Sequence, residues 1–308
     1  MSESQPHLFW MFTYAQATER FTPDEVRARV ASGRWVRVFD GVYRSRDSPP
    51  TPRSLVAAAG LAIGRPVPAC LHTAAAIWGF DVLDDAETHI AVGPRLGCLR
   101  RPGLWPHQLD LRPADVVRAR CGTRLTAPDR TAVDLARFVP VRDALAVLDA
   151  AVASGRCTVD SLRHEVARHR GQRGVRLVRA LIPLADPHVD SPQESRLRQL
   201  CHMVGLPAPV RQLHVVDADG RWHDLDLGWA SEQVGAEYDG EVHDLPASRR
   251  KDRRRYNWFT DLGWRLFHAT DADIYGDPRP FLVRLARALD ATLPNRVLAT
   301  PGGAWTLP

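Results

Sequence analysis

Two short segments, residues 223–229 and 234–239, place carboxylates and apolar side chains in alternate positions. The carboxylates are Asp224, Asp226, Glu237 and Asp239. Successive side chains of a β-strand point to opposite faces, so this alternation predicts two strands, each with one acidic face. Leu225, Leu227 and Trp229 of the first segment would then share the apolar face.

The register of such a hairpin decides which carboxylates meet. A hairpin folded about residues 231 and 232 would place Asp226 opposite Glu237, and opposed residues share a face. The same register would place Asp224 opposite Asp239. All four carboxylates would then crowd together on one face of the sheet.

Crowded carboxylates either take up a proton or bind a cation, because like charges repel at short range. Mg²⁺ is held by a few carboxylates together with water and phosphate oxygens. One interpretation is therefore a site for Mg²⁺ (or Mn²⁺) formed by Asp226, Glu237 and Asp239. The other interpretation is a solvated strand face on which water screens the charges.

Two further residues are candidates for the same site. Glu194 lies three residues after Ser191 in a sequence typical of a helix start, so it has a capping role, yet it also heads the helical face that must pack on the sheet. His243 follows Asp239 by four residues and is a candidate general acid or base. The alternative for His243 is a histidine that is merely exposed in a loop.

A run of basic residues follows the hairpin and has two interpretations, a solvated helical face or a surface that binds phosphate groups. The candidate DNA-binding residues in this run are Arg249, Arg250, Lys251, Arg253, Arg254 and Arg255. Lys251 is the only lysine of the chain, so arginine supplies nearly all of its positive charge.

The elements predicted around these residues, over residues 190–292, are a helix, a three-strand meander, a helix, a strand and a last helix. Their expected ranges are 191–204, 210–216, 221–229, 233–239, 248–262, 264–268 and a helix from Pro278. A tail, residues 293–308, follows this expected domain.

The first 47 residues predict a separate small domain. Thr22-Pro23-Asp24-Glu25 is typical of a capped helix start, and Gly33 ends that helix. Asp40-Gly41 between alternating apolar residues predicts a hairpin. A helix, a helix and a hairpin within about 40 residues outline a winged helix-turn-helix.

Residues 48–52 form an expected linker, and residues 53–185 form a mixed, mainly helical middle region. The expected fold class is thus a multi-domain α+β or α/β chain: a winged helix, the middle region and an α-βββ-α-β core.

The composition of the 308 residues sets further bounds. Hydrophobic residues make up 44 % of the chain, which is enough for buried cores, and the net charge is +5. The charge indicates either a polyanionic partner or the arginine usage of a GC-rich genome. The sequence contains no apolar run of about 18 residues, so we expect no membrane span and a cytoplasmic location. The five cysteines are widely spaced, and we expect free thiols.

Residues 191–198, Asp226-Leu227-Gly228-Trp229, Glu237-Tyr238-Asp239-Gly240 and Gly263-Trp264 resemble a bacterial family related to very-short-patch repair endonucleases. Those enzymes belong to the PD-(D/E)XK superfamily. The resemblance implies Mg²⁺-dependent phosphodiester hydrolysis, with Asp226 as the central metal ligand, Glu237 in the third motif, and roles for Glu194 and His243. Asp239 stands where that superfamily usually has lysine.

Residues 12–17, 32–37 and 41–43 resemble the winged-helix antitoxins of abortive-infection type IV systems (AbiEi-like), and residues 126–137 continue the resemblance. The resemblance implies DNA binding and a cognate toxin as a partner. The residues that would contact DNA, on or beside the recognition helix and on the wing, are Arg27, Arg29, Arg34, Arg37 and Arg44.

Two functional hypotheses follow. The first is a metal-dependent DNA endonuclease that the winged helix targets to duplex DNA. The alternative is a non-catalytic regulator or antitoxin of a toxin–antitoxin or phage-defence system, in which the nuclease fold is vestigial. The sequence does not decide whether the chain is an enzyme, and it does not determine the oligomeric state.

Overall fold

The computed structural model describes residues 11–93, 100–119, 122–240, 246–300 and 305, with only the backbone described for residues 246–252. The chain divides into two compact units. Unit 1 contains residues 1–138 and 150–170, and unit 2 contains residues 139–149 and 171–308.

The N-terminal part of unit 1 contains two short helices and a small sheet. Its elements are β1 (Phe12–Thr13), α1 (Tyr14–Thr18), α2 (Pro23–Ala31), β2 (Trp35–Phe39) and β3 (Val42–Ser45). The sheet order is β1-β3-β2, with antiparallel pairs. Capping boxes at Thr13 and Thr22 begin the helices, and Gly41 takes the left-handed φ of 70° that the tight turn needs. The predicted order of helix, helix and hairpin is confirmed.

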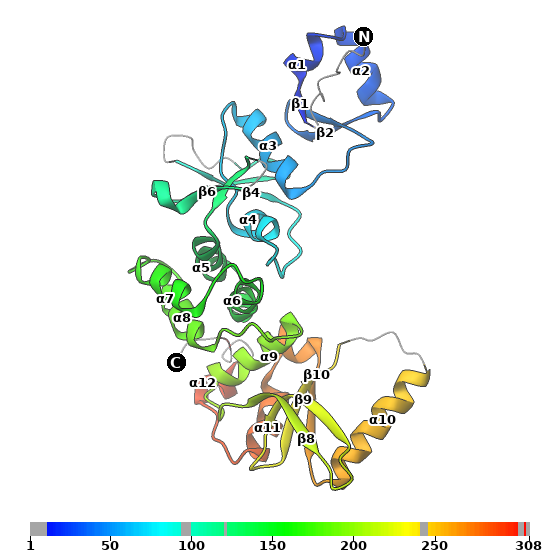
Figure 1. Cartoon of the computed structure of the whole chain (residues 1–308), viewed down its shortest axis with the longest axis vertical. Helices are drawn as coiled ribbons and strands as arrows, with labels where there is room; N and C mark the ends of the chain where they lie inside the picture. The colour runs from blue at the N-terminus through cyan, green and yellow to red at the C-terminus, as the bar shows by residue number, and fades with distance from the viewer. Residues whose placement is uncertain (1–10, 94–99, 120–121, 241–245, 301–304, 306–308) are drawn as a thin grey trace. The chain divides into compact units, whose positions relative to one another are not determined.

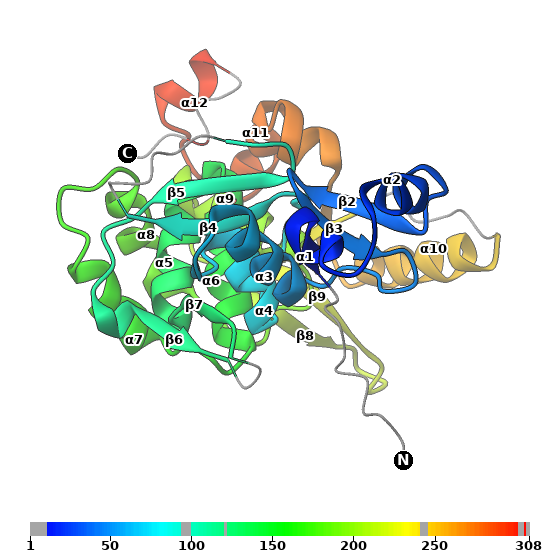
Figure 2. The ribbon, with the colours of Figure 1, turned by 90° about the horizontal axis from the view of Figure 1, so that it is seen from above.

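The remainder of unit 1 consists of helices and two small two-stranded sheets (Figure 2). Strands β4 (Thr88–Val92) and β5 (Leu104–Gln108) are parallel, whereas β6 (Val116–Arg118) and β7 (Arg124–Thr126) are antiparallel. The helices of this region are α3 (Pro52–Ile63), α4 (Leu71–Trp78), α5 (Pro128–Phe138) and α7 (Val159–Ala167). The helix α6 (Ala144–Ala153) spans the boundary of the units, and a short 3-10 turn, η2, covers Pro113–Asp115.

Within the mainly helical region expected over residues 53–185, the apolar patterning of the sequence predicts helices near 69–80, 128–138, 141–154 and 159–169 and a strand at 89–92, and all of these are present. Strands β5, β6 and β7 were missed. The two strands of the β6–β7 hairpin have three residues each, and β5 contains Pro106, so none of them shows a strand-like alternation.

Unit 2 is built around a four-stranded sheet of order β11-β10-β9-β8. Its strands are β8 (Val210–Val216), β9 (Trp222–Trp229), β10 (Val234–Tyr238) and β11 (Arg265–Ala269), with only β10 and β11 parallel. Its helices are α8 (Val175–Leu181), α9 (Pro192–Met203), α10 (Pro246–Asp261), α11 (Arg279–Ala288) and α12 (Asn295–Ala299). Short turns η3 (Val141–Asp143), η4 (Ile182–Leu184) and η5 (Ala272–Gly276) complete the unit.

The helices of unit 2 cover both faces of the sheet (Figure 1). One face packs against α9 and α11 through the larger apolar cluster, which includes Leu197, Leu227 and Phe281. The other face packs against α10 through a cluster that includes Leu225 and Phe259. The predicted element order of residues 190–292 is confirmed, and α12 lies in what was expected to be a tail.

The register between β9 and β10 is the predicted one where the strands pair. Trp229 lies opposite Val234, and Leu227 lies opposite Ala236. The predicted faces of β9 are wrong, however, because Leu225 and Leu227 pack in the two different clusters on opposite sides of the sheet. Side-chain alternation is therefore interrupted between these two leucines, at Asp226.

The neighbouring strand supplies the physical reason for this change of face. Gln212 has a left-handed backbone with φ of 43°. The pairing of β8 with β9 omits Gln212 and Asp226, although it continues on either side of them. A residue with a left-handed backbone breaks the regular pleat of a strand. The side chains on the two sides of this position therefore no longer follow one continuous alternation between the faces of the sheet.

Cys70, Cys157 and Cys201 are free and buried, as expected, and Cys98 and Cys121 lie outside the described residues. Among the described helices, none combines the length and the apolar composition that a membrane span requires. The mixed α and β class expected from the sequence is confirmed.

Candidate functional site

Asp226 occupies the interruption in β9 and is partly buried. Its Oδ2 accepts a hydrogen bond from the backbone N–H of Tyr238 at 3.2 Å. The pKa of the Asp226 carboxyl is raised to about 7, first by burial and then by the carboxylates of Glu194 and Glu237. The carboxylates of Glu194 and Glu237 are therefore close enough to Asp226 to interact with it electrostatically.

Glu237 is buried, with 7 % of its surface exposed, and its charge is matched by an arginine. The guanidinium of Arg255 on α10 donates to both carboxylate oxygens, with Nη1 at 2.7 Å from Oε2. The same guanidinium donates to the backbone oxygen of Asp224 at 2.7 Å. Arg255 is thus engaged inside the unit, where the sequence had suggested a phosphate contact.

Glu194 has both carboxylate oxygens in use. Ser191 Oγ donates to Oε1 at 2.8 Å, and Gln212 Nε2 donates to Oε2 at 3.1 Å. The cavity that Glu194 and Asp226 line has a volume of about 10 Å³. This volume is at the lower limit for one water molecule.

The remaining carboxylates do not join this group. Asp224 Oδ1 lies 2.8 Å from Nδ1 of His214 on β8, and Asp239 is exposed beyond the end of β10. Because Asp224 alternates with Leu225, which packs against α10, it points away from the face that carries Glu237. The prediction of four carboxylates on one face is therefore wrong.

Within the described residues, no set of three or more His, Cys, Asp or Glu side chains is arranged to hold a metal ion. His243 lies outside the described residues. Arg249, Arg250 and Lys251 belong to α10, and nothing is described of their side chains. Arg253 and Arg254 are exposed on the same helix.

The candidate DNA-binding arginines of the N-terminal part fall into two groups. Arg27 on α2, Arg34 before β2 and Arg37 on β2 are exposed. Arg27 pairs with Asp24 and Arg37 pairs with Asp40, but these acids are themselves 86 % and 73 % exposed. Exposed ion pairs contribute at most about 1 kcal/mol, so the guanidiniums can exchange these partners for phosphate.

The other two arginines stabilise the domain itself. Arg29 lies over the ring of Phe21, with its guanidinium carbon 3.9 Å from the ring centroid. Arg44 donates to the backbone oxygens of Ser45, Arg46 and Ser48 at 3.0–3.3 Å. Exposure therefore separates three arginines that face solvent from two that pack locally, a distinction that sequence spacing did not make.

Comparison with known proteins adds to this geometry. Residues 67–184 match the family described as the AbiEi antitoxin C-terminal domain. The chain is also 34 % identical over 270 residues to Uncharacterized protein Rv2248 of Mycobacterium tuberculosis strain H37Rv. The same identity relates it to Uncharacterized protein MT2308 of strain CDC 1551. Each alignment covers 87 % of this chain and 97 % of the relative.

The chain belongs to the same family as these mycobacterial proteins. The match to an antitoxin domain supports the resemblance to AbiEi-like antitoxins that the sequence suggested. The comparisons give no support to the resemblance to very-short-patch repair endonucleases.

The first functional hypothesis, a metal-dependent DNA endonuclease, is therefore wrong. The antitoxin match fits the alternative, a regulator of a toxin–antitoxin or abortive-infection system. The local geometry explains why the sequence suggested a nuclease. Acidic residues are present at a suitable spacing, but the guanidinium of Arg255 binds Glu237 and the side-chain amide of Gln212 binds Glu194. These contacts come from α10 and β8, which the motif spacing does not reveal.

Proposed function

We propose that this protein is a DNA-binding transcriptional regulator and antitoxin of a toxin–antitoxin or abortive-infection system. The observation that carries the proposal is the match of residues 67–184 to the AbiEi antitoxin C-terminal domain. This matched region follows the small N-terminal domain with its exposed arginines, an order suited to a protein that reads DNA and also holds a partner.

In this proposal the N-terminal domain binds DNA as a winged helix. The helix α2 enters the major groove, and the β2–β3 hairpin acts as the wing. Arg27 lies on the proposed recognition helix, Arg34 just after it and Arg37 on the wing. Arginines at such positions contact phosphate groups, which supply affinity and make it dependent on salt.

The matched region is the proposed binding surface for a cognate toxin. A toxin of this kind would be a protein encoded next to this chain. Binding would keep the toxin inactive, while the N-terminal domain represses the promoter of both genes.

The DNA-binding part is tested with a labelled fragment from upstream of the protein's own gene, in a gel-shift series over several salt concentrations. Replacing three phosphate contacts, as in R27A/R34A/R37A, should lower the slope of log K against log salt by about 3. The matched control is R163A/R176A/R179A, which removes three exposed arginines elsewhere. Equal affinity and slope for the wild type and R27A/R34A/R37A would refute the winged-helix assignment.

The antitoxin part is tested by growth of cells that express the protein encoded beside this chain, with and without this chain. Rescue of growth by the full chain, together with co-purification of the two proteins, supports the proposal. If the neighbouring protein is harmless or the chain does not rescue growth, the antitoxin assignment fails even where DNA binding is retained.

A further inference from the structure

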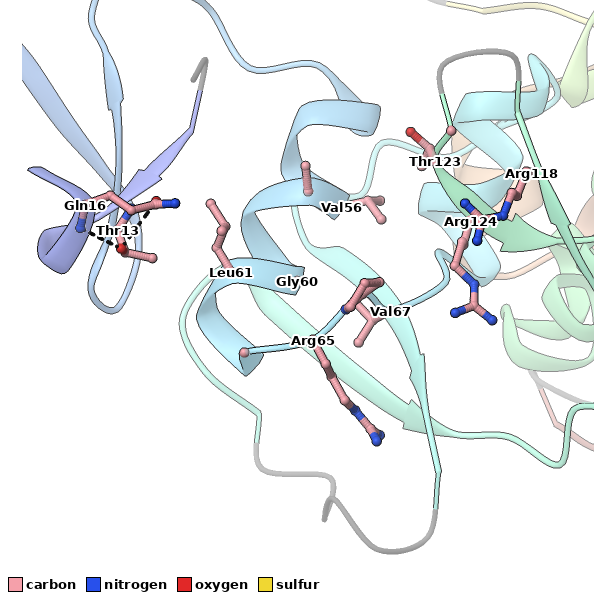
Figure 3. A pocket seen from close by; sticks show the side chains of 14 residues that line it. Thr13, Gln16, Val56, Gly60, Leu61, Arg65, Val67, Arg118, Thr123 and Arg124 are labelled. Atoms are coloured by element: carbon pink, nitrogen blue, oxygen red, sulfur yellow. Dashed lines mark hydrogen bonds between the residues drawn. The ribbon is translucent and has the colours of Figure 1, made fainter. Parts of the chain in front are cut away.

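Unit 1 contains a pocket of about 720 Å³ lined by α3, the segment that follows it, the β6–β7 hairpin, and Thr13 and Gln16 of β1 and α1 (Figure 3). We call it the arginine pocket, because Arg65, Arg118 and Arg124 line it. Val56, Leu61 and Val67 give it an apolar wall. The volume lies within the range of about 300–1,000 Å³ that is usual for small-molecule sites.

The charges of the pocket are unbalanced. Arg118 and Arg124 lie directly opposite each other across the β6–β7 hairpin, so their side chains leave the same face. No acidic residue lines the pocket within the described part of the chain. Like charges in opposed positions destabilise a hairpin by a few tenths to about 1 kcal/mol, so this pair favours an anion between its guanidiniums.

The three guanidiniums are also available for a ligand. Arg65, Arg118 and Arg124 are exposed, and across the described residues their side chains form no ion pair or hydrogen bond. This contrasts with Arg130 and Arg168 of the same unit, which are both held by Asp115. The pocket arginines are therefore not part of the internal ion-pair network.

The backbone around Arg65 is fixed by the end of α3. Gly64 ends the helix with a left-handed φ of 79°, and the N–H of Arg65 donates to the oxygen of Gly60 at 3.0 Å. A side chain on Gly60 would approach the Arg65 oxygen to 3.3 Å, so glycine permits this close packing. The start of the Arg65 side chain is thus held at the rim of the pocket.

We propose that the arginine pocket binds a nucleoside phosphate. Guanidinium groups bind phosphate oxygens in a bidentate manner, which assigns the phosphates to Arg118 and Arg124, and Arg65 adds a third positive charge to the lining. The apolar wall suits the nucleoside part. An adjoining pocket of about 910 Å³ shares Arg65 and Arg124 and also contains Arg112, but Asp110 lines it as well, which makes it less favourable for an anion than the arginine pocket.

A nucleic-acid strand is the less favoured occupant. Strand-binding grooves combine basic residues with aromatic side chains on which bases stack, and no aromatic residue lines the arginine pocket among the described residues. The proposal goes beyond the regulatory function proposed above and does not depend on it, since a nucleotide can bind whether or not the protein represses a promoter.

The test is calorimetric titration of the full chain with ATP, AMP, adenosine and inorganic phosphate at one fixed salt concentration. We expect saturable binding of ATP, weaker binding of AMP with its single phosphate, and no binding of adenosine. R118Q/R124Q should weaken ATP binding at least tenfold. The control R176Q/R179Q removes the same charge from two exposed arginines of α8 and should bind ATP as the wild type does.

Thermal melting without ligand shows whether the two arginines are instead structural. Removing two opposed like charges should leave the melting temperature of R118Q/R124Q equal to or above that of the wild type. A clear fall in melting temperature would mean that these side chains stabilise the fold, and would overturn the proposal.

In the last part of the experiment, the wild type and R118Q/R124Q are titrated with duplex and with single-stranded DNA. Absence of nucleotide binding by the folded wild type, or equal ATP binding by R118Q/R124Q, would overturn the proposal. The proposal would also be overturned if the wild type bound no nucleotide and R118Q/R124Q bound DNA more weakly than the wild type. That result would identify the pocket as a contact for nucleic acid.

Discussion

Arg255 holds both carboxylate oxygens of Glu237, and this pair joins α10 to strand β10 in the interior of the sheet. The sequence indicated different roles for the two residues, a metal ligand and a phosphate contact. The structure makes them partners, with 9 % of the Glu237 side chain and 28 % of the Arg255 side chain exposed.

Removing one member of this pair should destabilise unit 2. Arg255→Ala leaves the Glu237 carboxylate buried without its counterion, and we expect a loss of about 2–3 kcal/mol in the free energy of unfolding. The measurement is urea-induced unfolding followed by tryptophan fluorescence. Arg253→Ala, an exposed neighbour on α10, is the control and should change the value by no more than about 0.5 kcal/mol. Equal stability of Arg255→Ala and the wild type would contradict the pairing.

Asp226 predicts that stability depends on pH between about 4 and 7. Its pKa is raised to about 7 in the folded protein by burial, Glu194 and Glu237, whereas the ordinary value is 3.8. A raised carboxyl pKa means that the unfolded chain releases the proton first, so stability falls as pH rises from about 4 through 7. Asp226→Asn cannot ionise and should melt above the wild type at pH 8, with a smaller difference at pH 5. A difference that does not vary with pH would show that Asp226 is not protonated in the folded state.

For His107 we expect stability to change with pH in the opposite direction, so that it falls as the pH becomes acidic. Its pKa is lowered to about 4 by burial and by His89 and His72, while Asp85 acts in the opposite direction and Arg100 adds to the lowering. The unfolded chain binds the proton first, so this stabilisation is complete above about pH 6.5 and is lost as pH falls toward 4. His107→Gln should therefore lose less stability than the wild type between pH 7 and pH 4. Parallel pH profiles in a melting experiment would argue against a neutral, partly buried His107.

Asp115 is expected to be essential for the stability of unit 1. It is 2 % exposed and accepts from Arg130 Nη1 at 3.1 Å and from Arg168 Nη2 at 2.7 Å. Asp115→Ala leaves two guanidiniums without their shared acceptor, and we expect a loss of about 3 kcal/mol or more. Asp160→Ala removes an exposed aspartate that pairs with Arg163, and it should cost less than about 1 kcal/mol. Comparable losses for both variants in chemical unfolding would contradict a buried network.

The local features of this protein follow from its sequence. Thr22 and Ser191 precede their helices with the side chains that cap them, and Asp40-Gly41 forms the expected hairpin turn. The register of Trp229 with Val234 also follows from apolar patterning on the two strands. These features depend on residues only a few positions apart, where propensity, capping and alternation act directly.

Long-range features depended on the tertiary structure. The left-handed backbone of Gln212 interrupts β9 at Asp226, and alternation within β9 carries no sign of it. Glu237 meets Arg255 because α10 packs on the sheet, and Asp115 meets Arg168 because α7 packs near η2. The order of the elements and the chemistry of each side chain follow from the amino-acid sequence. Which charges are neutralised by a partner and which remain open to a ligand depends on the folded structure, because burial and pairing involve residues that are distant along the chain.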